Sequence, residues 1–201
     1  MSCPSQDLEI IEGSTFTRVV RWESNPLVYK AITGITKAGP VAITAVGHGL
    51  TEGWRSAVVS AGGMRQINAK SMPPRESEFH VVSITSSSVI TFNEVNSQDY
   101  TAYTSGGSLV YWTPHDLASY TARMQVRSTD ASDTVLLSLT TENAGIALDD
   151  TAKTITLTIT ATATAALTFT EGVYDLELVS SGGVVTKILR GTITVSQEVT
   201  R

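Results

Sequence analysis

The segment after Lys153 alternates between threonine and a large aliphatic residue at every position. It reads Thr-Ile-Thr-Leu-Thr-Ile-Thr over residues 154–160, so Ile155, Leu157 and Ile159 share one side of an extended chain. Side chains of a β-strand alternate between two faces, whereas those of a helix repeat about every 3.6 residues. The pattern therefore predicts a strand with one face in a core and the other toward water.

The same period of two recurs in other segments of the C-terminal block. The expected inward-facing sets are Ala122, Met124 and Val126 in one segment, and Tyr174, Leu176 and Leu178 in another. Further strands are expected at residues 184–189 and 192–195, and the Ser-Gly-Gly at 181–183 indicates a hairpin. Residues 161–167 could extend a strand, but their alanines and the Gly172 that follows favour a short helical turn between sheets.

The turn signals of this block have the spacing of a β-sandwich, which usually needs about seven strands. The block supplies five or six of them. Residues 8–11 and 15–22 also have strand character, with a glycine turn between them, but no partner strands follow them directly. We therefore expect the two ends of the chain to form one domain together.

A glycine-punctuated block with strands of its own lies between these parts. We expect an inserted domain at residues 30–112, with residues 1–29 and 113–201 forming the outer domain. The candidate strands of the insert are residues 41–46, 56–60, 79–84, 89–93 and 108–112. The predicted fold is all-β: an immunoglobulin-like β-sandwich interrupted by a small β-barrel-like domain.

The composition and net charge indicate which classes of binding partner to expect. Hydrophobic residues make up 41% of the 201 residues and charged residues 16%, which is typical of a globular protein with a core. The net charge is −5 and the sequence has no cluster of lysines and arginines, so no nucleic-acid partner is expected. Cys3 has no second cysteine to pair with, which favours folding in a reducing cytoplasm. The sequence shows no signal peptide or membrane-spanning run, so no membrane partner is expected.

The residue types that carry catalysis or bind metals do not form a recognisable pattern. His48, His80 and His115 share no metal-ligand spacing, so we interpret them as structural and expect no metal or cofactor. No nucleophile elbow is present. The adjacent carboxylates Asp149 and Asp150 lie in what reads as a turn, where they would bond the local backbone. We therefore predict no catalytic residues and a protein that is not an enzyme.

Large aromatic residues flank both junctions between the expected domains. Trp22 precedes the insert, and Tyr111 and Trp112 close it. Aromatic faces are suited to binding sugars, but burial is the commoner fate of such side chains. We favour packing of these three residues between the domains over a sugar platform.

The outer domain resembles the N-terminal domain of phage baseplate upper proteins and related tail-fibre attachment domains. The residues that carry the resemblance are 8–16, 116–127 and 172–178 through 191–195. The insert resembles the first catalytic-cysteine half-domain of ubiquitin-activating enzymes, a small β-fold that recurs in phage structural proteins, over residues 41–50, 62–68 and 100–107. The likeness implies a fold and a virion context, and it does not imply the enzyme's activity.

These resemblances imply a structural component of a tailed-phage virion, made in the host cytoplasm, at the tail, baseplate or fibre attachment. Its partners would be other virion proteins, contacted through several symmetric copies on the particle. The candidate contact is the loop of residues 72–78, above all Pro73, Pro74, Arg75 and Glu76, because a proline-stiffened loop loses little entropy on docking. A head-decoration or neck protein, and a carbohydrate-binding adhesion module, remain open as alternatives.

Overall fold

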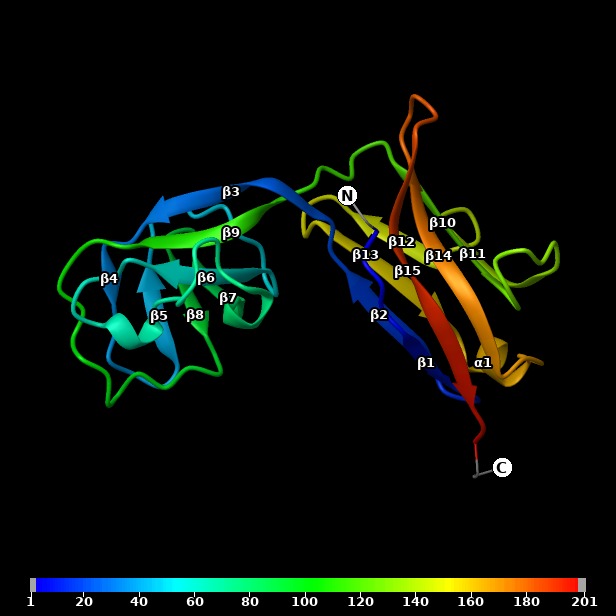
Figure 1. Ribbon diagram of the computed structural model, residues 1–201, viewed down its shortest axis with the longest axis horizontal. Coiled ribbons are helices and arrows are strands. Elements are labelled where there is room, and N and C mark those ends of the chain that lie inside the picture. The colour runs from blue at the N-terminus through cyan, green and yellow to red at the C-terminus, as the bar shows by residue number, and fades with distance from the viewer. Residues whose placement is uncertain (1–2, 199–201) are drawn as a thin grey trace. The chain divides into compact units, whose positions relative to one another are not determined.

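The computed structural model describes residues 3–198 and divides them between two compact units (Figure 1). The first unit consists of the described residues within Met1–Trp22 and Asp116–Arg201, and the second consists of Glu23–His115. Strands account for 47% of the residues and helices for 6%, so the all-β class is confirmed. The outer domain is therefore discontinuous in sequence, and the second unit is inserted into it.

The outer unit is a sandwich of two sheets. One sheet has the strand order β1-β15-β14-β10-β11 and the other the order β12-β13-β2. The strands are β1 (Leu8–Ile11), β2 (Phe16–Val20), β10 (Thr121–Arg127), β11 (Val135–Thr140), β12 (Ile146–Asp149), β13 (Thr154–Ile159), β14 (Glu171–Val179) and β15 (Val185–Ser196). A helix, α1 (Ala161–Ala165), connects β13 in one sheet to β14 in the other.

The alternation seen in the sequence places the core of the sandwich as expected. Ile155, Leu157 and Ile159 on β13 are buried, as are the inward sets of β10 and β14. These side chains belong to one hydrophobic core between the two sheets. The predicted helical turn is also confirmed, and the Thr160 side chain caps it by accepting a hydrogen bond from the Ala163 amide.

The last strand differs from the prediction because it runs unbroken. Residues 184–189 and 192–195 were expected as two strands, but β15 spans both. A register shift beside Leu176 lets β15 accommodate an extra residue, so Ile188 and Leu189 are both buried although they are neighbours. A bulge of this kind interrupts the period of two. The expected break falls just after it, at Arg190 and Gly191, where glycine has no side chain to continue the pattern.

The N-terminal segment is fastened along β15. β1 pairs with β15 in parallel, and the Gln6 amide extends the pairing by donating to the Arg190 carbonyl at 2.8 Å. A Cβ on Gly191 would lie 2.0 Å from the Gln6 carbonyl oxygen, so the crossing requires glycine there. The Tyr174 hydroxyl donates to the same Gln6 oxygen at 2.7 Å, which ties β14 to the start of the chain.

The insert contains a second hydrophobic core, and the buried residues that form it are different from those of the sandwich core. Its strand order is β3-β9-β6-β7-β8-β5-β4. The strands are β3 (Glu23–Ala31), β4 (Gly34–Ile35), β5 (Val41–Thr44), β6 (Arg55–Val59), β7 (His80–Ser86), β8 (Val89–Phe92) and β9 (Ser108–Pro114). Short 3-10 turns, η1 (Arg65–Ile67) and η2 (Glu76–Glu78), interrupt the connection from β6 to β7.

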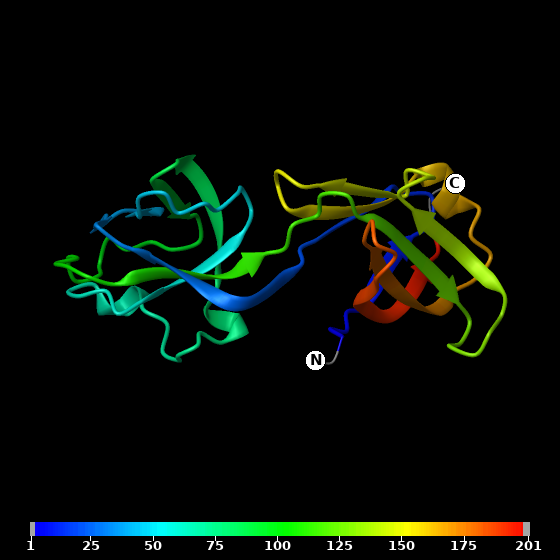
Figure 2. The same ribbon diagram turned by 90° about the horizontal axis from the view of Figure 1, so that it is seen from above.

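The sheet of the insert closes on itself through one segment. Ile32 and Thr33 separate β3 from β4, and they bond to opposite edges of the sheet. The Ile32 amide donates to the Gly107 carbonyl beside β9, whereas the Thr33 amide donates to the Thr44 carbonyl in β5. The segment from β3 to β4 thus pairs with both ends of the sheet, which makes the insert a small barrel (Figure 2).

The insert begins earlier than the sequence suggested. We expected it at residues 30–112, but it extends from Glu23 to His115 because β3 already pairs with β9 at Glu23 and Ser24, before the irregularity at Asn25 and Pro26. Pro26, which has no amide proton to donate, is a residue that would suit a break in a strand. It lies instead at an irregularity of the pairing in a strand at the end of the strand order, where a residue without an amide proton is tolerated.

No helix among the described residues is both long enough and apolar enough to cross a membrane.

Candidate functional site: the loop and groove of the insert

The predicted contact loop, residues 72–78, is ordered by its own residues. Met72, Pro73, Arg75 and Glu76 are exposed, whereas Pro74 is buried. Pro74 therefore anchors the loop to the insert instead of offering a contact. The end of the loop forms the 3-10 turn η2, in which the Glu78 amide donates to the Arg75 carbonyl at 2.9 Å.

Glu78 fixes the two ends of this loop with one carboxylate. Its Oε1 accepts a hydrogen bond from the Lys70 amide at 2.6 Å, and its Oε2 accepts one from the Arg75 amide at 2.7 Å. These backbone bonds, that from Arg75 first, lower the pKa of Glu78 below its usual value. Both oxygens of this carboxylate are thus engaged within the insert.

Arg55 connects the loop to the barrel wall. Its Nε donates to Glu23 at the start of β3 at 2.5 Å, and its Nη1 donates to Glu76 in η2. The guanidinium carbon also lies 5.2 Å from the centre of the Phe79 ring, a cation–π distance. Burial alone would lower the pKa of Arg55, but the two carboxylates raise it on balance. The loop is therefore held in one arrangement before any partner arrives.

A groove of about 440 Å³ lies beside this loop. Its lining includes Gln66, Lys70, Arg75, Glu78, His80 and Tyr100. Tyr100 is half-buried and packs against the barrel core. His80 stacks on Phe92 at 4.7 Å between ring centres, and its Nδ1 lies 3.0 Å from Glu94 Oε1. The groove thus combines fixed walls with polar side chains.

His48 has both ring nitrogens engaged inside the barrel. The Leu50 amide donates to Nδ1 at 3.0 Å, so Nε2 carries the proton and donates to the Ser86 carbonyl at 2.9 Å. The side chain is 2% exposed. This pattern accounts for His48 as a link between its Gly-His-Gly turn and the end of β7.

The other histidines lie far from it in the chain, on β7 (His80) and at the C-terminal end of the insert (His115). Within residues 3–198, no three His, Cys, Asp or Glu side chains are grouped as metal ligands would be.

The aromatic residues near the two junctions, Trp22, Tyr111 and Trp112, are each at least half-buried. Trp22 packs against the sandwich core and meets Tyr120 edge-on, with 6.1 Å between ring centres. Tyr111 is buried in the barrel and its hydroxyl donates to the His48 carbonyl. Trp112 is half-buried on β9. Packing of these residues between the units stays a prediction.

The carboxylate pair noted in the sequence belongs to a turn of the sandwich, as expected. Asp149 accepts hydrogen bonds from the amides of the turn that follows it. Asp150 accepts one from Lys153 at 2.7 Å and one from the Leu117 amide at 2.7 Å. The bond from Lys153, followed by that from Leu117, lowers the pKa of Asp150 to about 2. Asp150 therefore fastens the point where the chain re-enters the sandwich, at Asp116, whereas Asp149 orders its own turn.

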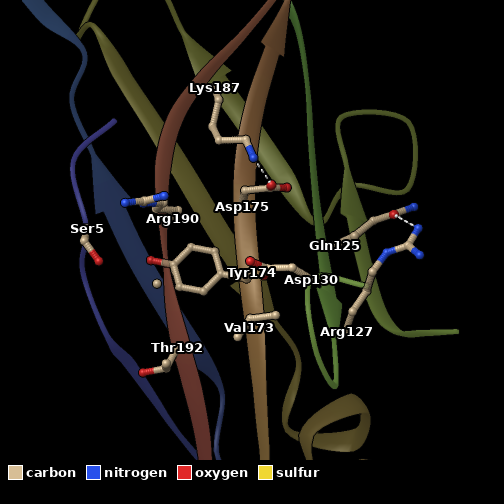
Figure 3. Close-up of a pocket in the computed structure, with 11 residues that line it drawn as sticks. Ser5, Gln125, Arg127, Asp130, Val173, Tyr174, Asp175, Lys187, Arg190 and Thr192 are labelled. Carbon is tan, nitrogen blue, oxygen red and sulfur yellow. Dashed lines mark hydrogen bonds and ion pairs between the residues drawn. The ribbon is translucent and has the colours of Figure 1, made fainter. Parts of the chain in front are cut away.

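The outer face of the larger sheet carries a shallow polar cleft of about 520 Å³ (Figure 3). Lys187 pairs with Asp175 there, and Arg127 donates to Gln125 at 2.8 Å. Burial, with a smaller contribution from Asp7, raises the pKa of Tyr174 to about 12, so its hydroxyl stays a hydrogen-bond donor. Among the charged residues of this cleft, Lys187 and Asp175 form an ion pair, whereas Arg127, Asp130 and Arg190 form none with any side chain within residues 3–198. The groove of the insert lies beside the contact loop predicted from the sequence, so we take the groove as the candidate site.

Sequence reasoning found the loop but not the residues that hold it. Arg55 is 21 residues from Glu76 and 32 from Glu23, so no local pattern joins them. Tyr100 and Lys70, 30 residues apart in the sequence, both line the groove. The run from Lys70 to Glu78 did contain a signal, because a glutamate three residues after Arg75 suits a turn of this kind.

The chain matches no protein-family model, and no curated protein is significantly similar to it in sequence.

Proposed function

We propose that this protein is a structural component of a tailed-bacteriophage virion, at the tail, baseplate or fibre-attachment region, and that it acts by protein–protein assembly. The observation that carries the proposal is the discontinuous architecture. A sandwich built from both chain ends holds a self-contained barrel between β2 and β10. This is the arrangement implied by the resemblance to phage attachment domains, and it suits a part that joins components.

The ordered loop supports a role in contacts. Arg55 and Glu78 fix residues 70–79 from two sides, so docking would cost little additional ordering. Weak contacts repeated around a symmetric ring hold together by effective concentration. We expect the isolated protein to be monomeric or weakly self-associating in dilute solution, and present in several copies on the particle.

Imaging of labelled particles tests the proposal directly. The protein carrying a small tag should appear in purified virions, at symmetric positions on the tail. Density at the head or neck would favour the head-decoration or neck alternative. Complete absence of the tagged protein from purified particles, with normal particle yield, would sink the proposal.

Changes to exposed loop residues test where the contact lies. Met72→Ser with Arg75→Ser alters exposed side chains and leaves buried Pro74 in place. We expect reduced incorporation into particles and an unchanged melting temperature. Val46→Ser with Lys37→Ser is the matched control, because both residues are exposed elsewhere on the insert. Equal incorporation of both variants would move the docking surface to the sandwich.

A further inference from the structure

The carboxylates around the groove of the insert are already occupied. The insert contains six acidic and six basic residues, so its own net charge is zero. Near the groove, Glu78 accepts backbone amides, Glu76 pairs with Arg55 and Glu94 lies against His80. Glu78 keeps its charge and interacts electrostatically with Arg75, whereas Glu76 and Glu94 are engaged by Arg55 and His80.

Lys70 and Arg75 are the two cationic side chains that line the groove. Lys70 and Arg75 are exposed, and neither forms an ion pair with any side chain within residues 3–198. The backbone amides of both residues are committed to Glu78, which fixes where their side chains begin. Ammonium and guanidinium groups donate hydrogen bonds and accept none. The groove thus presents two positioned donors of positive charge.

The rest of the lining is also suited to a carboxylate-bearing chain. The Tyr100 hydroxyl and the Ser77 hydroxyl can both donate. Ile67, Ala69 and Val95 add apolar surface, which methylene groups of an acidic side chain can cover. The Tyr100 ring already packs against the barrel core, which counts against a sugar stacked on it. These features favour a peptide over a glycan.

We propose that the groove between Lys70, Arg75 and Tyr100 binds an acidic peptide segment of a neighbouring structural protein. The inference rests on the proposed role in assembly and names the chemistry of the partner. Carboxylates of the segment would meet Lys70 and Arg75 as charge-assisted hydrogen bonds, and the bidentate geometry of arginine would orient one of them. The fixed loop lowers the entropy lost on binding.

The test uses the full chain and a labelled hexaglutamate peptide as the probe. Fluorescence anisotropy should show binding that weakens as ionic strength rises toward about 0.15 M. Lys70→Gln with Arg75→Gln should weaken binding by about tenfold, since the two lost contacts together correspond to roughly one decade in Kd. Lys30→Gln with Lys37→Gln removes the same charge from the insert away from the groove and should change Kd by less than about twofold. Melting curves confirm that each variant is folded.

Two outcomes would overturn the inference. Equal weakening in both double variants would show a general charge effect and no site. Binding of tetragalacturonate without binding of hexaglutamate would show that the groove takes an acidic sugar. The particle images test the assembly role separately: a protein missing from virions whose groove still binds hexaglutamate defeats the proposed function, and a protein present in virions whose groove ignores the peptide defeats this inference.

Discussion

The sandwich and the barrel both have a hydrophobic core, but the barrel has the longer connections between strands, such as that from β6 to β7. In the sandwich, alternating strands such as β13 put one apolar face into a single core, and burial aligns the sheets. In the barrel, polar side chains bind the backbone of loops. Asn68 bonds both the amide and the carbonyl of Ala61, at 2.8 and 3.0 Å, and buried Ser97 donates to the Thr36 carbonyl at 2.7 Å.

The difference shows where a β-protein can place a contact surface. Alternating strands yield regular faces, whose outward side chains are free to vary. Loops yield shaped surfaces, but each needs polar partners for its backbone groups. Asn68 and Glu78 supply those partners in the insert, and Arg55 adds side-chain bonds to Glu23 and Glu76, which explains why the candidate groove lies there.

Excision of the barrel should have the largest effect on the chain and a small effect on the sandwich. Glu23 and Pro114 are paired in register, so the two ends of the excised barrel lie about 5 Å apart. Joining Trp22 to Asp116 through a short Gly/Ser bridge should leave a cooperatively unfolding domain, because closure of a short loop costs little entropy. Urea titration followed by circular dichroism measures this. A gradual, non-cooperative loss of signal would mean that the sandwich depends on the insert.

A change at His48 should destabilise the barrel selectively. His48→Ala leaves the Leu50 amide and the Ser86 carbonyl without their partner in a buried site. We expect a loss of about 2–6 kcal/mol in unfolding free energy, from two unsatisfied groups at about 1–3 kcal/mol each. His80→Ala is the control, because its half-exposed ring should cost about 1 kcal/mol or less. Similar losses in calorimetry would contradict the assigned role of His48.

Acid should weaken the re-entry turn of the sandwich. The folded pKa of Asp150 is about 2, below the unfolded value of about 3.9, so its contribution is present above about pH 4 and is lost as the pH falls toward 2. Asp150→Asn should therefore lower the melting temperature at neutral pH, and the difference from the native chain should shrink between about pH 4 and pH 2. A difference that stays constant with pH would show that the charge of Asp150 does not act here.

The smallest effect is expected at Ser56 in the barrel. Its hydroxyl is fully buried and has no hydrogen-bond partner among the described residues. Ser56→Ala removes an unsatisfied polar atom at little cost in volume, so we expect a melting temperature that is unchanged or slightly higher. A loss of more than about 1 kcal/mol in unfolding free energy would reveal a bond that the hydroxyl makes.

The sequence by itself predicted the clearly alternating strands of the sandwich and the discontinuity of the outer domain, but it did not predict β3, β11 or β12. The spacing of Ile155, Leu157 and Ile159 at every second position predicts a buried face, because side chains alternate between two faces along any extended backbone. The alanines between Ala161 and Ala165 likewise predicted the helix between the sheets, since helix propensity depends on the local sequence.

Only the tertiary structure decided the start of the insert, the closure of the barrel and the groove. Pro26 suggests a break in the sequence, although β3 pairs with β9 on both sides of it. The sequence around Thr33 likewise does not predict its hydrogen bond to Thr44. Arg55 joins Glu23 and Glu76 across 32 and 21 residues. Such contacts depend on which strands become neighbours, and that outcome follows from the burial of the whole core, which no short window of sequence contains.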